Sequence, residues 1–262
     1  MARMYTKKRC NSKRARSNRY RRIKKGGMNS PKVAIVFVGR IKGYEEVQDK
    51  LKHLKDKYNA TVFCSLNKKN KTPYIENFCK LMEISDERLR LEKSPPPPEY
   101  TKNIRIADET RGKWGNGIGL NNTHSAFYHQ QQVCKMIESY QNANAMQFDI
   151  VLFYRPDINA ENELIFKNPI KKATLYVPVT EPSCDHSGVC DRCYYGDFDT
   201  MKTTLNIIDS VEDICRNKGV LYNSEALLKA HMENNKIQIE GFPYQFKLLD
   251  SRHMPHPEAN IE

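Results

Sequence analysis

Arg155 and Asp157 lie two residues apart, directly after the apolar run 150–154. A carboxylate at such a place can hold a divalent cation, and that cation can hold a diphosphate. A short apolar run without alternation is typical of a strand buried on both faces, and Pro156 should end its pairing because proline has no N–H. Since ligands of open α/β sheets bind beyond the carboxyl ends of the strands, the segment predicts a ligand site; capping of the next turn by Asp157 is the alternative.

The second half of the chain carries further carboxylates near predicted strand ends and helix starts, namely Asp191, Asp197, Asp199 and Glu225. Transfer of a sugar from a sugar nucleotide needs a cation or basic group for the leaving diphosphate. It often needs a carboxylate as base for the acceptor hydroxyl as well. The chain could supply both, but ordinary α/β proteins also carry acids at these places.

Three cysteines and one histidine fall within ten residues: Cys184, His186, Cys190 and Cys193. They could provide four tetrahedral Zn²⁺ ligands, and the last two have the usual knuckle spacing. Cys184 and His186 lie only six and four residues before Cys190, which is a short spacing for a second pair of ligands. A polar loop with incidental cysteines is therefore the alternative. We expect no secretory signal, because the basic N-terminal segment lacks an apolar stretch, and we therefore expect reduced thiols.

Three common sequence motifs of nucleotide-binding and hydrolytic sites are absent. The chain has no G-x-x-x-x-G-K-[ST] loop, no strand-linked G-x-G-x-x-G and no G-x-S-x-G elbow. These absences argue against a P-loop protein, weaken the case for a dinucleotide-binding fold and give no support to a serine hydrolase.

The elements that would position these residues form a pattern of alternating strands and helices. Residues 33–39 predict a buried strand, 47–58 an amphipathic helix and 60–66 a second strand. Such a βαβ unit makes the two strands parallel. Further along, the sequence predicts a helix over 124–144 capped by Asn122 and Thr123, the strand within 148–157, a strand over 173–179, helices over 200–216 and 224–234, and strand material in 236–249.

The net charge of +12 comes from the N-terminus. Residues 1–26 contain twelve Lys and Arg and no acidic residue, whereas the rest of the chain carries 31 basic and 31 acidic side chains. Such a segment cannot bury enough apolar surface to fold alone, so we expect a disordered basic arm over residues 1–30 and one domain over 31–262. The arm could bind nucleic acid or an anionic surface, or serve as a localisation signal; a solvated arm with no specific partner is the alternative.

Six short motifs, in collinear order over about residues 32–249, resemble those of glycosyltransferase-like proteins of large DNA viruses and some microbes, which are related to GT-A sugar-nucleotide transferases. The motifs are Val33–Tyr44, Phe63-Cys64-Ser65-Leu66-Asn67, Thr123–His129, Phe148–Asp157, Asp191 with Tyr195–Lys202, and Asn223–Leu228. The resemblance implies a GT-A-like, Rossmann-type α/β fold, in which a mixed, mostly parallel sheet is flanked by helices.

Site roles follow from the same resemblance. It places Gly39 and Arg40 beside the nucleotide, Arg155 and Asp157 at the acidic metal- and diphosphate-binding motif, and Asp191 and Glu225 on the acceptor side as candidate bases. Asp157 would hold Mn²⁺ or Mg²⁺. Arg155 replaces the first acid of the family's D-x-D motif, so one carboxylate is left for a metal, and the arginine could instead neutralise the diphosphate directly. Ser224 replaces the family's proline before Glu225.

The expected function is therefore transfer of a sugar from a nucleotide-diphosphate donor to a hydroxyl of a glycan or glycoprotein. No apolar run approaches the roughly 20 residues of a membrane span, and we expect a cytoplasmic protein, located in the host cytoplasm or the virion if it is viral. One alternative is a catalytically silent transferase-like scaffold whose basic arm binds nucleic acid. Another is a small interaction module stabilised by zinc.

Overall fold

The computed structural model describes residues 30–41, 43–69, 71–103, 118–179 and 188–249. The chain divides into two units at Ser30 and Pro31, and almost all of the first unit lies outside the described residues. The predicted basic arm therefore stays a prediction. In the second unit, no helix within the described residues is long and apolar enough to cross a membrane.

The fold is built on a sheet whose strands have the order β3-β2-β1-β4-β7-β6-β8. The pairs β1–β2, β2–β3, β1–β4 and β6–β8 are parallel, whereas β7 is antiparallel to both of its neighbours. The predicted mixed, mostly parallel sheet flanked by helices is thus confirmed. The strands are β1 Val33–Gly39, β2 Thr61–Asn67, β3 Leu89–Glu92, β4 Ile150–Tyr154, β6 Thr174–Pro178, β7 Cys193–Gly196 and β8 Gln238–Phe242.

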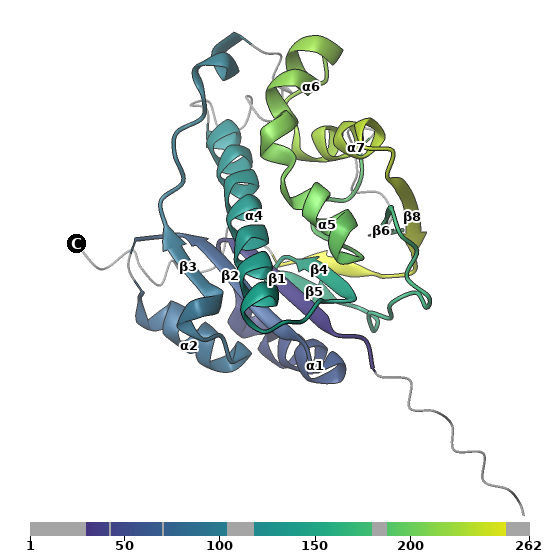
Figure 1. Ribbon diagram of the computed structural model, residues 1–262. Helices are drawn as coiled ribbons and strands as arrows, with labels where there is room; N and C mark the ends of the chain where they lie inside the picture. Colours follow the sequence, from purple (N-terminus) through teal and green to yellow (C-terminus); the bar gives the residue numbers. More distant parts are fainter. Residues whose placement is uncertain (1–29, 42, 70, 104–117, 180–187, 250–262) are drawn as a thin grey trace, which may run out of the picture. The chain divides into compact units, whose positions relative to one another are not determined.

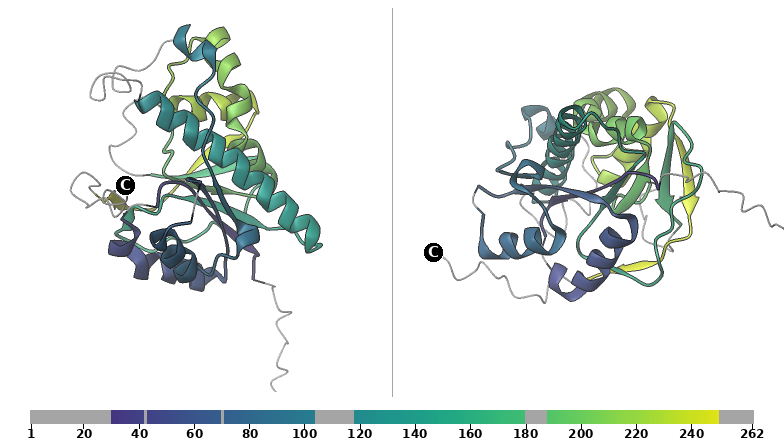
Figure 2. Two further views of the ribbon diagram at one scale, coloured as in Figure 1. Left: turned by 90° about the vertical axis from the view of Figure 1, so that its left-hand side faces the viewer. Right: turned by 60° about the horizontal axis from the view of Figure 1, so that its bottom comes forward.

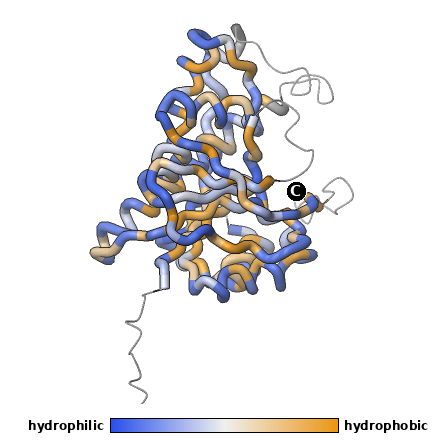
Figure 3. The backbone as a smooth tube through the Cα atoms, turned by 90° about the vertical axis from the view of Figure 1, so that its right-hand side faces the viewer, coloured by the Kyte–Doolittle hydropathy of each residue, from blue (hydrophilic) through white to orange (hydrophobic). Residues whose placement is uncertain are grey.

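Helices cover both faces of this sheet, with α1 and α2 on one side and α4, α5 and α7 on the other (Figures 1 and 2). The alternation of side chains along β1 shows why both faces are apolar. Ile35 and Phe37 pack into the core beneath α1 and α2, whereas Ala34 and Val36 pack into the core beneath α4. Hydrophobic and hydrophilic stretches alternate along the whole domain (Figure 3).

The predicted βαβ unit is confirmed by the parallel pair β1–β2. The helices are α1 Gln48–Tyr58, α2 Pro73–Met82, α4 Ile118–Ala143, α5 Phe198–Leu205, α6 Val211–Lys218 and α7 Ser224–Asn234. Short 3-10 turns are η1 Tyr44–Val47, η2 Asp86–Arg88, η3 Glu99–Asn103 and η4 Ile207–Ser210, and a small second sheet pairs β5 Ile158–Ala160 with β9 Phe246–Leu248.

Three predictions about these elements were wrong. α4 begins at Ile118, so Asn122 and Thr123 lie inside the helix instead of capping it. The helix predicted over 200–216 is broken into α5, η4 and α6, because Asn206 ends α5 and its side-chain amide donates to the Lys202 carbonyl. Finally, Cys193 lies in a central strand, β7, and not in a cysteine-rich loop.

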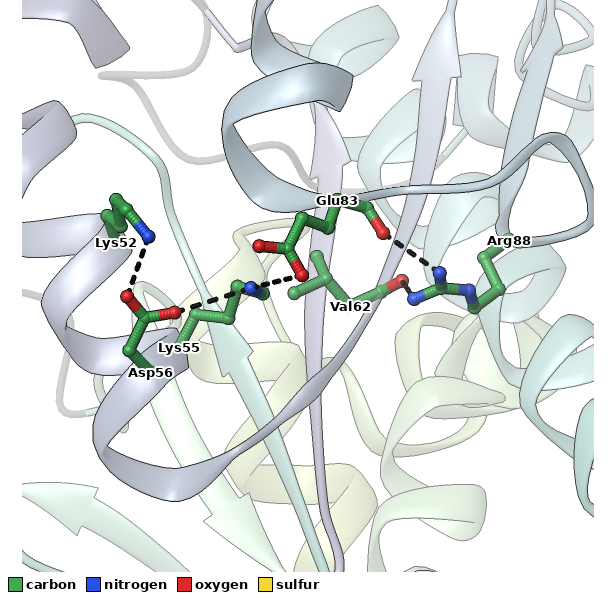
Figure 4. A network of polar contacts seen from close by, with 6 residues as sticks. All are labelled: Lys52, Lys55, Asp56, Val62, Glu83 and Arg88. Atoms are coloured by element: carbon green, nitrogen blue, oxygen red, sulfur yellow. Dashed lines mark hydrogen bonds and ion pairs between the residues drawn. The ribbon is translucent and has the colours of Figure 1, made fainter.

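A polar network fixes the ends of several elements on the α1 and α2 side (Figure 4). The Lys55 ammonium lies 2.8 Å from the Glu83 carboxylate, which joins the last turn of α1 to the residue that ends α2. Arg88 donates to the backbone carbonyls of Glu83 and Val62, at 2.8 and 3.3 Å. These bonds satisfy carbonyl groups that a helix end and a strand start would leave open.

Candidate functional site

A cavity of about 480 Å³ opens at the carboxyl ends of β1, β2 and β4. These strands are parallel neighbours, so their ends meet at one edge of the sheet, where α/β proteins bind ligands. Gly39 and Arg40 reach the cavity from β1, Asn67 from β2, and Arg155 and Asp157 from the segment after β4. Residues of α4 and the start of α7 complete its walls.

The antiparallel strand β7 brings Asp191 to the same place. Tyr154 at the end of β4 pairs with Cys193 at the start of β7, and the Arg155 N–H donates to the Arg192 carbonyl at 3.0 Å. The residues just after β4 therefore meet those just before β7, and Asp191 lines the cavity with Asp157. The structure thus gathers five of the six predicted site residues around one cavity, from segments up to about 150 residues apart in the chain.

Arg155 and Asp157 form a two-pronged ion pair within the cavity wall. The Arg155 Nε donates to Asp157 Oδ1 at 3.0 Å and its Nη2 donates to Oδ2 at 2.6 Å. The Asp157 side chain is only 15% exposed. Burial lowers the pKa of Arg155, but the negative charges of Asp157 and Asp191 and the hydrogen bond to Asp157 outweigh burial and raise that pKa above its usual value. Arg155 therefore carries its positive charge at every physiological pH.

Glu225 occupies a different position from the other five. It does not line the cavity; it is buried at the start of α7, with Oε1 3.9 Å from Nη2 of Arg192. The backbone around it is packed against the segment before β7, since the Val189 N–H donates to the Glu225 carbonyl and a Cβ on Gly188 would come within 2.4 Å of the Glu225 carbonyl carbon. Glu225 is thus in a position to support the segment that carries Asp191.

Gly39 ends β1 in a left-handed conformation, with φ of +82°. Non-glycine residues rarely adopt this backbone. A Cβ on Gly39 would meet no atom within 4 Å, because the residue borders the open cavity. Glycine here both permits the turn out of the strand and leaves space in the cavity.

The residues that line the cavity fit a divalent ion that arrives with a diphosphate, but they form no cage for an ion on its own. Within the described ranges, no group of three or more His, Cys, Asp or Glu side chains could hold a metal. Mg²⁺ is commonly bound by one or two carboxylates together with substrate phosphates. Asp157 could serve in this way, because each carboxylate oxygen has a second lone pair beyond the one that Arg155 uses.

The zinc hypothesis receives no support. Cys184 and His186 lie outside the described residues. Cys190 and Cys193 are buried, and burial raises the pKa of both thiols, whereas zinc binds the thiolate. Cys193 packs instead in the apolar core beneath α1 and α2.

Sequence reasoning missed several residues that line the cavity. Asn67 ends β2, and its amide donates to the Ser125 hydroxyl at 3.0 Å, which joins the strand to α4. Its position after a predicted strand was the same signal that indicated Asp157. Phe153 and Tyr194 also line the cavity, and their ring centroids stack 4.5 Å apart. Gln130 lines the cavity from the middle of α4. No pattern in residue type or spacing distinguished Gln130 from its neighbours.

Comparisons with known proteins give likenesses of architecture. No protein-family model and no curated protein matches this chain. Among solved structures, it is similar to the apo form of the glycosyltransferase GlyE of Streptococcus pneumoniae, with 10% identity, a TM-score of 0.44 and coverage of 80% of this chain and 45% of GlyE. It is also similar to core-mannan synthase A of Aspergillus fumigatus in an Mn/GDP form, with 11% identity, a TM-score of 0.45 and coverage of 83% and 74%.

A second GlyE structure matches with 10% identity, a TM-score of 0.40 and coverage of 81% of this chain and 45% of GlyE. The chain thus spans less than half the length of GlyE. These likenesses assign no role to an individual residue.

Proposed function

We propose that this protein is a glycosyltransferase that moves a sugar from a nucleoside-diphosphate donor to a hydroxyl group of an acceptor. The observation that carries the proposal is the cavity at the ends of β1, β2 and β4, which gathers a strand-ending glycine, two arginines and two aspartates. These residue types match the needs of this transfer, which are space for a nucleotide, positive charge for a diphosphate and a carboxylate base.

Arg155 and Arg40 are the cationic groups of the cavity wall, and Asp157 and Asp191 are its anionic groups. A guanidinium has five N–H donors, and the bonds to Asp157 use two of those of Arg155. The remaining donors suit phosphate oxygens, which arginine binds well. Arg155 therefore binds and orients the diphosphate.

The formal charges of these four side chains cancel, so a bound diphosphate needs further positive charge. Mn²⁺ or Mg²⁺ held by Asp157 and the diphosphate would supply that charge and make the diphosphate a better leaving group. Asp157 thus has two roles, as the partner that orients Arg155 and as the carboxylate for a divalent ion.

In the reaction, the bond between the sugar's anomeric carbon and the diphosphate oxygen breaks, and its electron pair leaves with the diphosphate. The acceptor oxygen forms the new bond to the same carbon, and its proton passes to a carboxylate base. We assign Asp191 as this base because it lines the cavity, whereas Glu225 does not. Glu225 then acts on the position of Asp191 through its neighbour Arg192.

The test is thermal stability of the purified protein with UDP-, GDP-, ADP- and CMP-sugars, each with and without Mn²⁺. We expect stabilisation by at least one diphosphate donor, and none by CMP-sugars, which carry one phosphate. Asp157→Asn should remove the part of the shift that depends on Mn²⁺, whereas Asp199→Asn, at an exposed position of α5, should leave the shift unchanged. Absence of any shift would count against the transferase and favour the silent scaffold with a nucleic-acid-binding arm.

A further inference from the structure

Gln130 is a buried amide in the cavity wall that the chemistry above does not use. It is only 5% exposed and lines the cavity from α4. Within the described part of the chain, no protein group bonds the Gln130 amide, which lines the cavity. The fully buried side-chain atoms without a partner belong to other residues of the described chain, so the Gln130 amide is accessible from the cavity. A ligand that fills the cavity and displaces solvent there must supply the hydrogen bonds of this amide, because an unpaired amide would be costly.

The helix geometry places Gln130 on a definite side of the cavity. Successive residues of an α-helix are rotated by about 100°. Ser125 bonds Asn67 at the end of β2, and His129, one turn later, bonds Ser65 of the same strand. This face of α4 is therefore directed at β2.

The opposite flank of α4 faces α5 and η4, since Gln131 donates to Asp209 and Glu138 pairs with Lys202. Gln130 follows His129 by one residue and so points between the two flanks. Its side chain therefore points away from β2 and toward the side of the cavity formed by β4 and β7.

That side of the cavity is the side of the reacting groups. Phe153 of β4 and Tyr194 of β7 stack on each other there and line the cavity. The segment after β4 carries Arg155, and the segment before β7 carries Asp191. In the proposed reaction the transferred sugar lies between the diphosphate and the base, which is the region these two segments flank.

We infer that Gln130 binds a hydroxyl group of the donor's sugar and thereby contributes to the choice of sugar. An amide both donates and accepts, which matches a sugar hydroxyl, and the adjacent aromatic rings suit the apolar face of a sugar ring. A site that hydrogen-bonds a hydroxyl discriminates against an analogue in which that hydroxyl is displaced, because a buried polar group is then left unpaired. This inference rests on the proposed function.

The experiment compares binding of a sugar nucleotide with binding of the same nucleoside diphosphate without the sugar, both in the presence of Mn²⁺, by calorimetry. Gln130→Met keeps the length of the side chain and removes its hydrogen bonds. We expect this variant to bind the sugar nucleotide about tenfold more weakly and the nucleoside diphosphate with unchanged affinity. The variant should also discriminate less than wild type between UDP-glucose and UDP-galactose, or the corresponding epimeric pair for the nucleotide that binds.

Gln132→Met is the matched control, because Gln132 is 4% exposed in the same helix but does not line the cavity. It should leave both affinities unchanged. An equal loss for both ligands in Gln130→Met would place the amide at the nucleotide and overturn the inference, as would no loss for either. If wild type binds neither ligand, the proposed function fails and the inference fails with it. This outcome is distinguishable from an equal loss or no loss in Gln130→Met, because both of those results require that wild type binds.

Discussion

Arg155 holds both carboxylate oxygens of Asp157, at 3.0 and 2.6 Å, in the wall of a cavity that also contains Asp191. The chain has a second pair of the same form, in which Arg90 binds Glu92 two residues on, at 2.6 and 3.1 Å. That pair lies on β3 and does not line the cavity. Comparison of variants at the two ion pairs therefore separates the effect of the ion pair itself from the effect of its position in the cavity wall.

Arg155→Gln should change metal binding and diphosphate binding in opposite directions. Loss of a positive charge beside Asp157 should tighten Mn²⁺ binding to the protein, because the carboxylates of the cavity then lack a competing cation. Binding of the nucleoside diphosphate without metal should weaken by about tenfold, because a charge-assisted bond is lost. Titration with Mn²⁺ followed by electron paramagnetic resonance, together with calorimetry of the nucleotide, measures both effects.

The matched control is Arg90→Gln, which removes the same kind of ion pair outside the cavity. It should alter neither affinity. If Arg155→Gln leaves both affinities at the wild-type values, Arg155 serves only to orient the backbone after β4 and its proposed role with the diphosphate is wrong.

The network around α1 and α2 should depend on bonds to backbone carbonyls more than on its surface charges (Figure 4). Arg88→Met keeps the apolar stem but removes donors from the Glu83 and Val62 carbonyls, and we expect a loss of about 1–2 kcal/mol in the free energy of unfolding. Lys52→Met removes an exposed ion pair with Asp56 and should have no measurable effect. Urea unfolding of the three proteins measures this, and equal losses in both variants would contradict the distinction.

The architecture was predictable where burial produces a clear pattern of apolar residues in the sequence. β4 begins and ends where the apolar run 150–154 does, because a strand covered on both faces cannot expose polar residues. β7 was missed although it is central, since its four residues are too few to show a period and follow two cysteines that suggested another chemistry. β3 was missed because its sequence, Leu-Arg-Leu-Glu, belongs to a half-exposed edge strand.

The candidate site was predictable only in part for a related reason. Arg155 and Asp157 follow a recognisable strand, and that position alone indicated a ligand site. Asp191 lies near them because β4 pairs with β7 in antiparallel orientation, and no local sequence pattern indicates this pairing. Gln130 lies within the helix predicted over 124–144, but whether it meets the cavity depends on the rotation of α4 against the sheet, which the residue types of the helix do not determine.

His129 should make the protein less stable in mild acid. Burial lowers its pKa to about 4 from the usual 6.5, and its Nδ1 lies 2.8 Å from the Ser65 hydroxyl. Because the folded-state pKa is the lower one, the neutral ring stabilises the fold fully above pH 6.5, and this contribution is lost as the pH falls toward 4. The loss at pH 4 should approach about 3 kcal/mol.

The measurement is urea unfolding at pH 7.5, 6.0 and 5.0 for wild type, His129→Asn and the control His53→Asn, whose side chain is exposed. His129→Asn should show a shallower fall in stability toward low pH, and His53→Asn should follow wild type. Burial also lowers the pKa of His124 and of His231, so some dependence on pH should persist in His129→Asn. Identical pH profiles for His129→Asn and wild type would show that His129 is not the group responsible.

Asp191 and Glu225 should differ in what their amide variants lose. Asp191 lines the cavity, so Asp191→Asn should lower kcat by about 100-fold or more and leave donor affinity unchanged. Glu225 is buried near Arg192 and outside the cavity wall, so Glu225→Gln should lower kcat less and reduce thermal stability. Kinetics with saturating donor, together with melting temperatures, separate the two. A larger loss of kcat in Glu225→Gln at unchanged stability would reverse the assignment and make Glu225 the base.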